Sequence, residues 1–202
     1  MASFLRIMWH PLSDAVFGGC PFQLRWRLIL FQLPTIFLYT WKCLPYLLSR
    51  PFVVRHIPSR RPGESLRALV YNHPSKCEPI GQKRPLHIDI HGGGFIGGIP
   101  EDNTPFCVQF AETTGAVVVS LTYRFAPRYP FPAAPDDIAD AFNWLRKNAE
   151  SEFGADTEIV TVSGISAGGT LALGATLGAK DSRGDNIVKG AVTFYSPVCL
   201  AP

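Results

Sequence analysis

One serine in this sequence stands where its hydroxyl could act as a nucleophile. Ser166 lies at the centre of Gly-Ile-Ser-Ala-Gly (residues 164–168), between a β-branched run at residues 160–163 and a helical pattern. A Gly-x-Ser-x-Gly sequence between a strand and a helix is typical of a nucleophile elbow, because side chains at Gly164 and Gly168 would collide in so sharp a turn. A glycine-rich turn with an incidental serine is the alternative, since a short motif is only a hypothesis.

A second group of glycines could supply hydrogen-bond donors. Residues 91–95 read His-Gly-Gly-Gly-Phe and follow an apolar strand pattern. Three consecutive glycines leave their backbone N–H groups unobstructed, and such donors can stabilise an oxyanion as it forms in acyl transfer. The alternatives are a flexible loop and a phosphate-binding turn. The phosphate-binding turn is disfavoured, because no lysine follows the glycines at the start of a helix.

Strands that alternate with helices are predicted around both motifs, which indicates a mostly parallel, three-layer α/β sheet. Two neighbouring acids, Asp136 and Asp137, fall in the first turn of a predicted helix, where we expect them to serve the helix terminus rather than acid–base chemistry. The predicted strands are residues 51–58, 66–71, 85–90, 116–121, 160–163 and 188–195, and the predicted helices are residues 104–113, 136–145 and 170–179.

The N-terminal part is apolar and its function stays open. Residues 1–21 show no clear period, whereas residues 21–48 are long and apolar enough for a transmembrane helix. Lys42 inside this window would be costly near a bilayer centre. Three alternatives remain: a membrane-spanning anchor, an interfacial or substrate-gating helical cap, and an ordinary buried helix pair. We therefore expect residues 1–50 to form an apolar cap or membrane-associating segment, and the location to be cytoplasmic or membrane-associated.

Composition and charge narrow the classes of partner. With 47% apolar and 17% charged residues, the sequence is that of a globular protein. Residues 1–70 carry nine Lys/Arg against two acids, but these charges alternate with apolar runs, which argues against nucleic acid and favours a membrane surface. The five cysteines contain no Cys-x-x-Cys pair and the histidines have no ligand-like spacing, so neither a disulfide framework nor a metal site is indicated. No cofactor is expected, because no dinucleotide fingerprint follows the first strand.

Two further blocks turn these motifs into a family resemblance. Residues 123–127 (Tyr-Arg-Phe-Ala-Pro) and 130–134 (Pro-Phe-Pro-Ala-Ala) stand between the glycine group and the serine. In this order the blocks resemble the hormone-sensitive-lipase-like group of α/β-hydrolases, the alpha/beta hydrolase fold-3 family, over residues 53–202. The family commonly has aspartate where this chain has Ile165, a mild departure that alters polarity beside the site.

The resemblance implies hydrolysis of carboxylic esters, with small to medium acyl esters as substrates. N-terminal segments of the family often cap the acyl pocket, which suits the apolar segment here. The implied roles are Ser166 as the nucleophile, the N–H groups of Gly93, Gly94 and Ala167 as the oxyanion hole, and His91 and Gly92 as loop support. We expect His91 to hydrogen-bond rather than to act as a base, because it precedes the serine in the chain, whereas the triad order of this fold is serine, acid, histidine.

The family's catalytic acid and histidine follow two further strands. After Ser166 this sequence has no histidine, and its only acids are Asp181 and Asp185, in a predicted helix-to-strand loop away from the site. We therefore expect an incomplete α/β-hydrolase domain over residues 51–202 with impaired catalysis, because a serine without a base is a poor nucleophile. A non-catalytic acyl-ligand binder or scaffold is the alternative. The apolar strand at residues 190–195 would then be a bare edge that aggregates or pairs with a partner.

Overall fold

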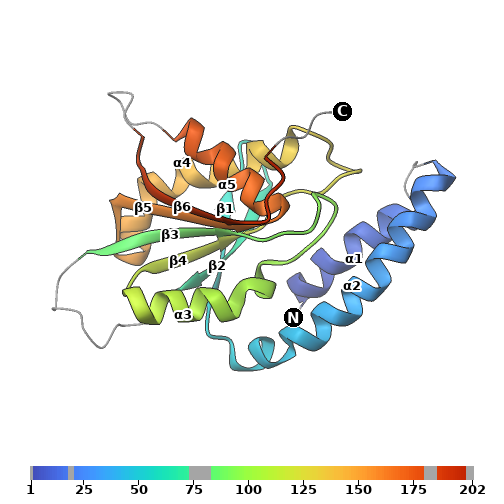
Figure 1. Ribbon diagram of the computed structural model, residues 1–202, viewed down its shortest axis with the longest axis horizontal. Helices are drawn as coiled ribbons and strands as arrows, with labels where there is room; N and C mark the ends of the chain where they lie inside the picture. Colours follow the sequence, from blue (N-terminus) through green and yellow to red (C-terminus); the bar gives the residue numbers. More distant parts are fainter. Residues whose placement is uncertain (1, 18–20, 73–82, 180–185, 199–202) are drawn as a thin grey trace.

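A six-stranded sheet forms the centre of the protein, in the order β1-β2-β4-β3-β5-β6 (Figure 1). The computed structural model describes residues 2–17, 21–72, 83–179 and 186–198. Three of the five strand pairings are parallel and two are antiparallel. The strands are β1 (Val53–Pro58), β2 (Ser65–Tyr71), β3 (Arg84–Ile90), β4 (Val117–Leu121), β5 (Ala155–Ile165) and β6 (Val188–Phe194).

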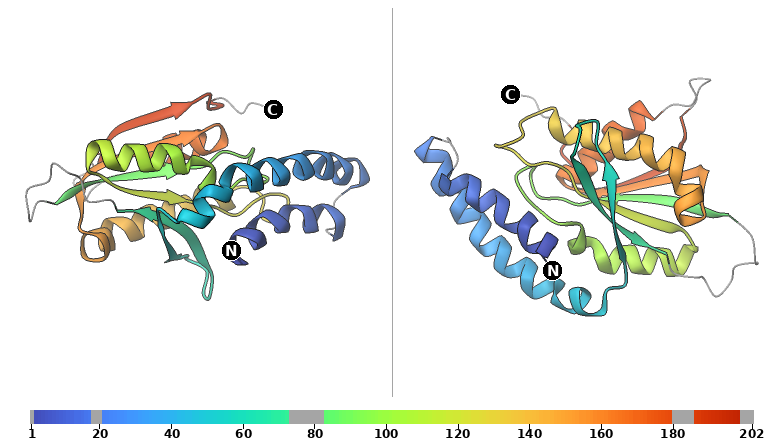
Figure 2. Two further views of the ribbon diagram at one scale, coloured as in Figure 1. Left: turned by 90° about the horizontal axis from the view of Figure 1, so that it is seen from below. Right: turned by 180° about the vertical axis from the view of Figure 1, so that it is seen from behind.

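Helices cover both faces of this sheet, so the predicted three-layer, mostly parallel α/β sheet is confirmed. The helices are α1 (Ala2–Phe17), α2 (Phe22–Ser49), α3 (Thr104–Thr114), α4 (Ala133–Phe153) and α5 (Ala167–Gly178), with a short 3-10 helix, η1 (Pro100–Asn103). On one face the larger apolar core joins the strands to α4 and α5, and on the other a smaller cluster joins β2 and β4 to α3 (Figure 2). Each sheet face therefore has its own apolar layer.

The first two strands form the antiparallel part of this mostly parallel sheet. β1 pairs with β2, and β2 with β4, in the antiparallel direction. The turn between β1 and β2 is short, and a short turn can join only antiparallel neighbours, because a parallel pair needs a crossover of a dozen or more residues. β4, by contrast, is buried along its whole length, as its β-branched sequence predicts.

The N-terminal segment differs more from expectation. Residues 2–17, which show no clear period in the sequence, form α1, and α1 packs alongside α2 to one side of the sheet (Figure 1). Only Leu28, Gln32 and Cys43 of α2 are buried. The alternative of an ordinary buried helix pair is therefore wrong. α2 is also long and apolar enough to cross a membrane, on length and composition alone.

Candidate active site

The serine singled out by the sequence lies at the end of β5, in a strained backbone conformation. Ser166 has φ 53° and ψ −122°, backbone angles that residues other than glycine rarely adopt. The helix α5 begins at the next residue. Its N–H donates to the carbonyl oxygen of Phe194 on β6 at 2.9 Å. Strain of this kind persists only where the surroundings enforce it, and it is often found at functional sites.

The two elbow glycines are enforced by close backbone contacts. A Cβ on Gly164 would lie 2.4 Å from the carbonyl oxygen of Gly168. A Cβ on Gly168 would lie 2.2 Å from the carbonyl oxygen of Ile90 at the end of β3. Because backbone atoms, rather than flexible side chains, would be struck, no larger residue fits at either position without moving α5.

The glycine-rich segment after β3 lies directly against the elbow. β3 and β5 are parallel neighbours, so the segments that follow their carboxyl ends meet at one edge of the sheet. A Cβ on Gly92 would be 3.0 Å from the carbonyl oxygen of Ile165 and 3.6 Å from Cβ of Ser166. We refer to residues 91–99 as the glycine loop.

Three backbone donors lie beside the serine. Within the described residues, the N–H groups of Gly93 and Gly94 donate no hydrogen bond to a backbone carbonyl. Ala167 is the first residue of α5, and the first N–H groups of an α-helix have no acceptor within the helix. Gly93 has φ 129°, and a Cβ there would lie 2.0 Å from the carbonyl oxygen of Gly97, so only glycine allows this loop conformation. These donors are the ones that the family resemblance assigns to an oxyanion.

His91 is the first residue of the glycine loop and is engaged on both ring nitrogens. Its Nδ1 donates to the carbonyl oxygen of Gly92 at 2.6 Å, so Nε2 accepts from the Thr122 hydroxyl at 3.1 Å. The ring stacks on Tyr123 at 4.7 Å between centroids. Burial lowers the pKa of His91 to about 4, which keeps the ring neutral at pH 7. This geometry suits a side chain that supports the loop.

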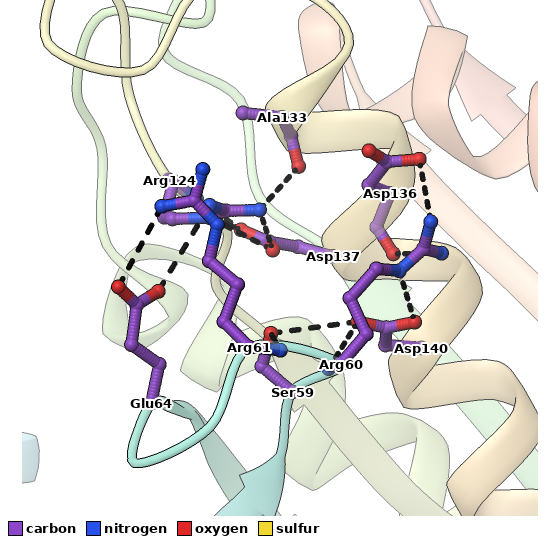
Figure 3. Close-up of polar contacts among 9 residues, drawn as sticks. All are labelled: Ser59, Arg60, Arg61, Glu64, Arg124, Ala133, Asp136, Asp137 and Asp140. Carbon is purple, nitrogen blue, oxygen red and sulfur yellow. Dashed lines mark hydrogen bonds and ion pairs between the residues drawn. The ribbon is translucent and has the colours of Figure 1, made fainter.

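A second anchor holds the loop from the side of α4. The N–H of Ala126 donates to the carbonyl oxygen of Phe95 at 2.9 Å. Two residues earlier, the backbone N–H of Arg124 donates to Asp137 Oδ2 at 2.8 Å, and its guanidinium pairs with the same carboxylate at 2.7 Å. Asp137 is fully buried. The Tyr-Arg-Phe-Ala-Pro block therefore ties the glycine loop to the start of α4 (Figure 3).

The role expected for the two neighbouring acids at the helix terminus is confirmed only in part, because Asp136 lies in the first turn of α4 whereas Asp137 lies beyond it. The residue that precedes α4 is Pro132, and no side chain caps this terminus by a hydrogen bond. Asp137 instead binds Arg124, while Asp136 pairs with Arg60 of the β1–β2 turn at 3.1 Å (Figure 3). Adjacent helix positions do point apart, but each carboxylate meets an arginine that is distant in the sequence.

A buried polar network on β3 has no counterpart in the sequence analysis. The carboxylate of Asp89 accepts from Ser120 at 2.9 Å, from Ser163 at 2.8 Å and from Asn103 at 3.0 Å. Burial raises the pKa of Asp89. The network joins three neighbouring strands to the end of η1, and so to the segment that follows the glycine loop. The signal in the sequence that could have indicated this network is Asp89, an acidic residue inside a predicted strand.

This network contains a histidine, a serine and an aspartate, yet its geometry is not that of a catalytic triad. His87 Nε2 donates to Ser163 Oγ at 2.9 Å, and Ser163 in turn donates to Asp89 rather than to a base. Ser163 is 1% exposed. Burial lowers the pKa of His87 to about 4. The set therefore fills the interior as a hydrogen-bonded chain with a neutral His87, closed to a substrate.

No general base for Ser166 is found in the part of the chain that the structure describes. No hydrogen bond there joins a histidine ring to Ser166: His56 lies 3.4 Å from a serine hydroxyl on β2, and His87 and His91 are engaged as above. The two acids that follow the serine in the sequence, Asp181 and Asp185, lie outside the described residues.

A wide groove lies beside the site rather than over it. A groove of about 900 Å³ runs between α4 and α5, with Phe95 and Leu171 in its wall, and Ser166 is not among its lining residues. A smaller pocket of about 500 Å³ lies between α1, the β1–β2 turn and residues 122–129. Ser166 lines neither of them, so neither by itself defines a substrate site.

Comparison with known proteins connects this geometry to a family. The sequence profile described as alpha/beta hydrolase fold matches residues 87–201. Esterase LipI of Mycobacterium tuberculosis is 38% identical over 115 residues, which are 57% of this chain and 35% of that protein. Ethyl acetate hydrolase of Pseudomonas putida is 35% identical over 112 residues, 55% of this chain and 34% of that protein.

Solved structures agree with the sequence matches. A hyperthermophilic esterase from the archaeon Pyrobaculum calidifontis superposes with a TM-score of 0.65 at 35% identity, over 79% of this chain and 50% of that one. The carboxylesterase EstE1, cloned from a metagenomic library, gives a TM-score of 0.62 at 32% identity, over 77% and 52%. The chain thus spans about half the length of these structures and about a third of the length of the two curated relatives above.

Proposed function

Because this chain belongs to the alpha/beta hydrolase fold family, we propose that it is a carboxylic ester hydrolase of the esterase and lipase kind, acting on small to medium acyl esters. The observation that carries the proposal is the meeting of Ser166, on its strained turn, with the glycine loop. A nucleophile and unused N–H donors lie side by side there, as acyl transfer requires.

In the proposed reaction, Ser166 Oγ attacks the carbonyl carbon of the ester. The carbonyl oxygen becomes negatively charged, and the N–H groups of Gly93, Gly94 and Ala167 donate hydrogen bonds to it. The C–O bond to the alcohol then breaks, which leaves an acyl group on the serine and releases the alcohol once its oxygen takes up a proton. Preorganised donors of this kind typically contribute a hundredfold or more to the rate.

Impaired catalysis by these 202 residues taken alone is part of the proposal. The step above needs a base to accept the serine proton, and no described histidine contacts Ser166. Loss of triad members costs up to about a millionfold in turnover, while binding and the oxyanion donors still leave about a thousandfold over water. The same observation favours a second candidate function, that of a non-catalytic acyl-ligand binder.

A fluorophosphonate probe separates these two functions, because it reacts with an activated serine. We expect the folded chain to be labelled slowly and the label to be absent from Ser166→Ala. Ser151→Ala, on the exposed surface of α4, serves as the matched control and should label as the parent does. No labelling of a sample whose circular dichroism shows a folded protein would reject the enzyme in favour of the binder.

The proposal also includes two surfaces. Residues 21–48 associate with a membrane surface, which suits a helix whose side chains are mostly exposed. β6 lies at one edge of the described sheet, with Val192 55% exposed, and pairs there with another strand. We expect self-association or low solubility that Val192→Lys reduces, measured by light scattering. A monodisperse parent protein would contradict the edge pairing.

A further inference from the structure

α2 presents two different faces, and the inner one is joined to the glycine loop. Gln32, Ile36, Tyr39, Cys43 and Leu47 recur every three or four residues and therefore share one side of the helix. Gln32 is only 3% exposed, and the last four of these residues form one apolar cluster with Ile99. The inner face thus packs against the segment that follows the loop glycines.

Polar contacts fix this inner face in place. Gln32 Nε2 donates to the carbonyl oxygen of Ile96 at 3.0 Å. Its amide also fills the space where a Cβ on Gly97 would lie, at 3.0 Å. Five residues before Leu47, the last α2 residue of the apolar cluster, Lys42 Nζ pairs with Asp102 at 2.6 Å. α2 is therefore attached at both ends of the segment 96–102, which begins just after the loop donors.

The outer face carries a continuous apolar stripe. Its seven members are spaced three or four residues apart, are between 44% and 77% exposed, and extend over about 33 Å at the rise of an α-helix. An exposed apolar surface of this length marks an interaction site. We define the outer stripe as Trp26, Leu30, Leu33, Phe37, Trp41, Leu44 and Leu48.

The charges around the outer stripe select its partner. After Asp14 the next acidic residue in the sequence is Glu64. Of the basic residues between them, four lie in or directly after α2, and one of these, Lys42, is paired with Asp102. Arg25 and Arg27 lie at one end of the stripe and Arg50 just beyond the other. An apolar face with tryptophans, basic neighbours and no acids is typical of a helix that lies in the interface of an anionic membrane.

The attachment of the inner face to the rest of the protein indicates whether α2 lies on a membrane or crosses it. A spanning helix would be surrounded by lipid at its midpoint, yet Gln32 and Cys43 are buried against protein. We propose that the outer stripe of α2 lies flat on an anionic lipid surface, so that the glycine loop is held next to esters in that interface. The delivery of ester substrates to the glycine loop rests on the proposed ester hydrolysis, whereas the binding of α2 to lipid does not.

Sedimentation of the full chain with vesicles tests the proposal without any measurement of hydrolysis. We expect binding to vesicles of phosphatidylcholine with phosphatidylserine, weaker binding to phosphatidylcholine alone, and weakening by salt. Phe37→Asp with Trp41→Asp should lower the binding about a hundredfold or more, because each aromatic side chain contributes about tenfold or more through its burial. Leu177→Asp, an equally exposed position on α5, should bind as the parent does.

Each outcome has a definite meaning. Absence of vesicle binding, equal loss in the Leu177→Asp control, or resistance of the bound protein to extraction at high pH would overturn the flat interfacial helix. A dimer in light scattering that the outer-stripe variant converts to monomer would replace lipid by a second copy of the chain. Ser166→Ala should bind vesicles unchanged, so failure of the hydrolase proposal and failure of this one are distinguishable.

Discussion

The same chemical change at two glycines of α5 should have opposite effects on stability. Gly174→Ala adds a methyl group to an exposed helical position, where no atom lies within 4 Å of the new Cβ. Gly168→Ala adds the same group where the carbonyl oxygens of Ile90 and His91 lie at 2.2 and 2.3 Å. Both positions belong to one helix, so differences in helix propensity cancel between them.

The two magnitudes follow from different causes. Alanine is favoured over glycine inside a helix by about 0.8–1 kcal/mol, so Gly174→Ala should stabilise the chain by roughly that amount. At Gly168 this gain is outweighed, because contacts more than an ångström inside van der Waals distance force α5 away from the end of β3. Overpacking of this kind costs about 1–3 kcal/mol or more. We expect the two variants to differ by roughly 3 kcal/mol.

Urea unfolding followed by circular dichroism measures this difference. With a slope of about 1–3 kcal/mol per molar urea, the midpoints of the two variants should lie roughly 1–3 M apart, on either side of the parent value. Gly168→Ala should also label more slowly at Ser166 with a fluorophosphonate, whereas Gly174→Ala should label normally. A Gly168→Ala protein as stable as Gly174→Ala would refute the close approach of the elbow to β3.

Three further predictions concern buried polar groups. His87 and His91 have pKa values of about 4 in the folded chain, below the ordinary 6.5, so the unfolded chain binds protons first as the pH falls. The free energy of unfolding should therefore drop between about pH 6.5 and 4, by up to about 3 kcal/mol for each ring. In the His87→Gln and His91→Gln variants the urea midpoint should depend less on pH. Asp137 is fully buried, and Asp137→Ala leaves the partly buried Arg124 with only the longer ion pair to Glu64 at 3.9 Å, so it should cost about 3 kcal/mol in unfolding free energy. Asp136→Ala breaks a more exposed pair and should cost less than about 1 kcal/mol, and similar losses in the two variants would contradict the burial difference. Gln32→Leu removes the donor to the glycine loop, worth about 1 kcal/mol, so loop amides should exchange roughly fivefold faster with deuterium while exchange in α4 stays unchanged.

Local constraints explain what the sequence predicts well. The turn at Ser166 requires glycine on both sides, and the apolar run before Leu121 suits a strand covered on both faces. In both cases neighbouring residues alone determine the local structure, so the sequence predicts it. α3 begins where expected and ends one residue later, before Gly115, which adopts a left-handed conformation with φ 72°. The meeting of the elbow and the glycine loop follows from parallel strands whose carboxyl ends share one edge.

Partners distant in the chain explain what the sequence does not predict. Asp137 sits 13 residues from Arg124 along the chain, and Asp136 sits 76 residues from Arg60, so helix position alone suggests a role at the terminus for both acids. Asp89 collects donors from segments up to 74 residues away, which no local period reveals. α1 is hidden because Pro11 interrupts its apolar pattern.

The pairing of β3 with β5 has a consequence for how the protein is made. His87 and Thr161 are partners although 74 residues separate them, and β4 and α4 lie between them in the chain. Pairings of such long range form slowly, because the chain loses the conformational entropy of the intervening loop before the strand contacts stabilise it. On the ribosome, β3 must therefore keep one side unpaired until residue 165 has left the exit tunnel. Chaperone capture of nascent chains should peak over that interval and fall once the elbow docks.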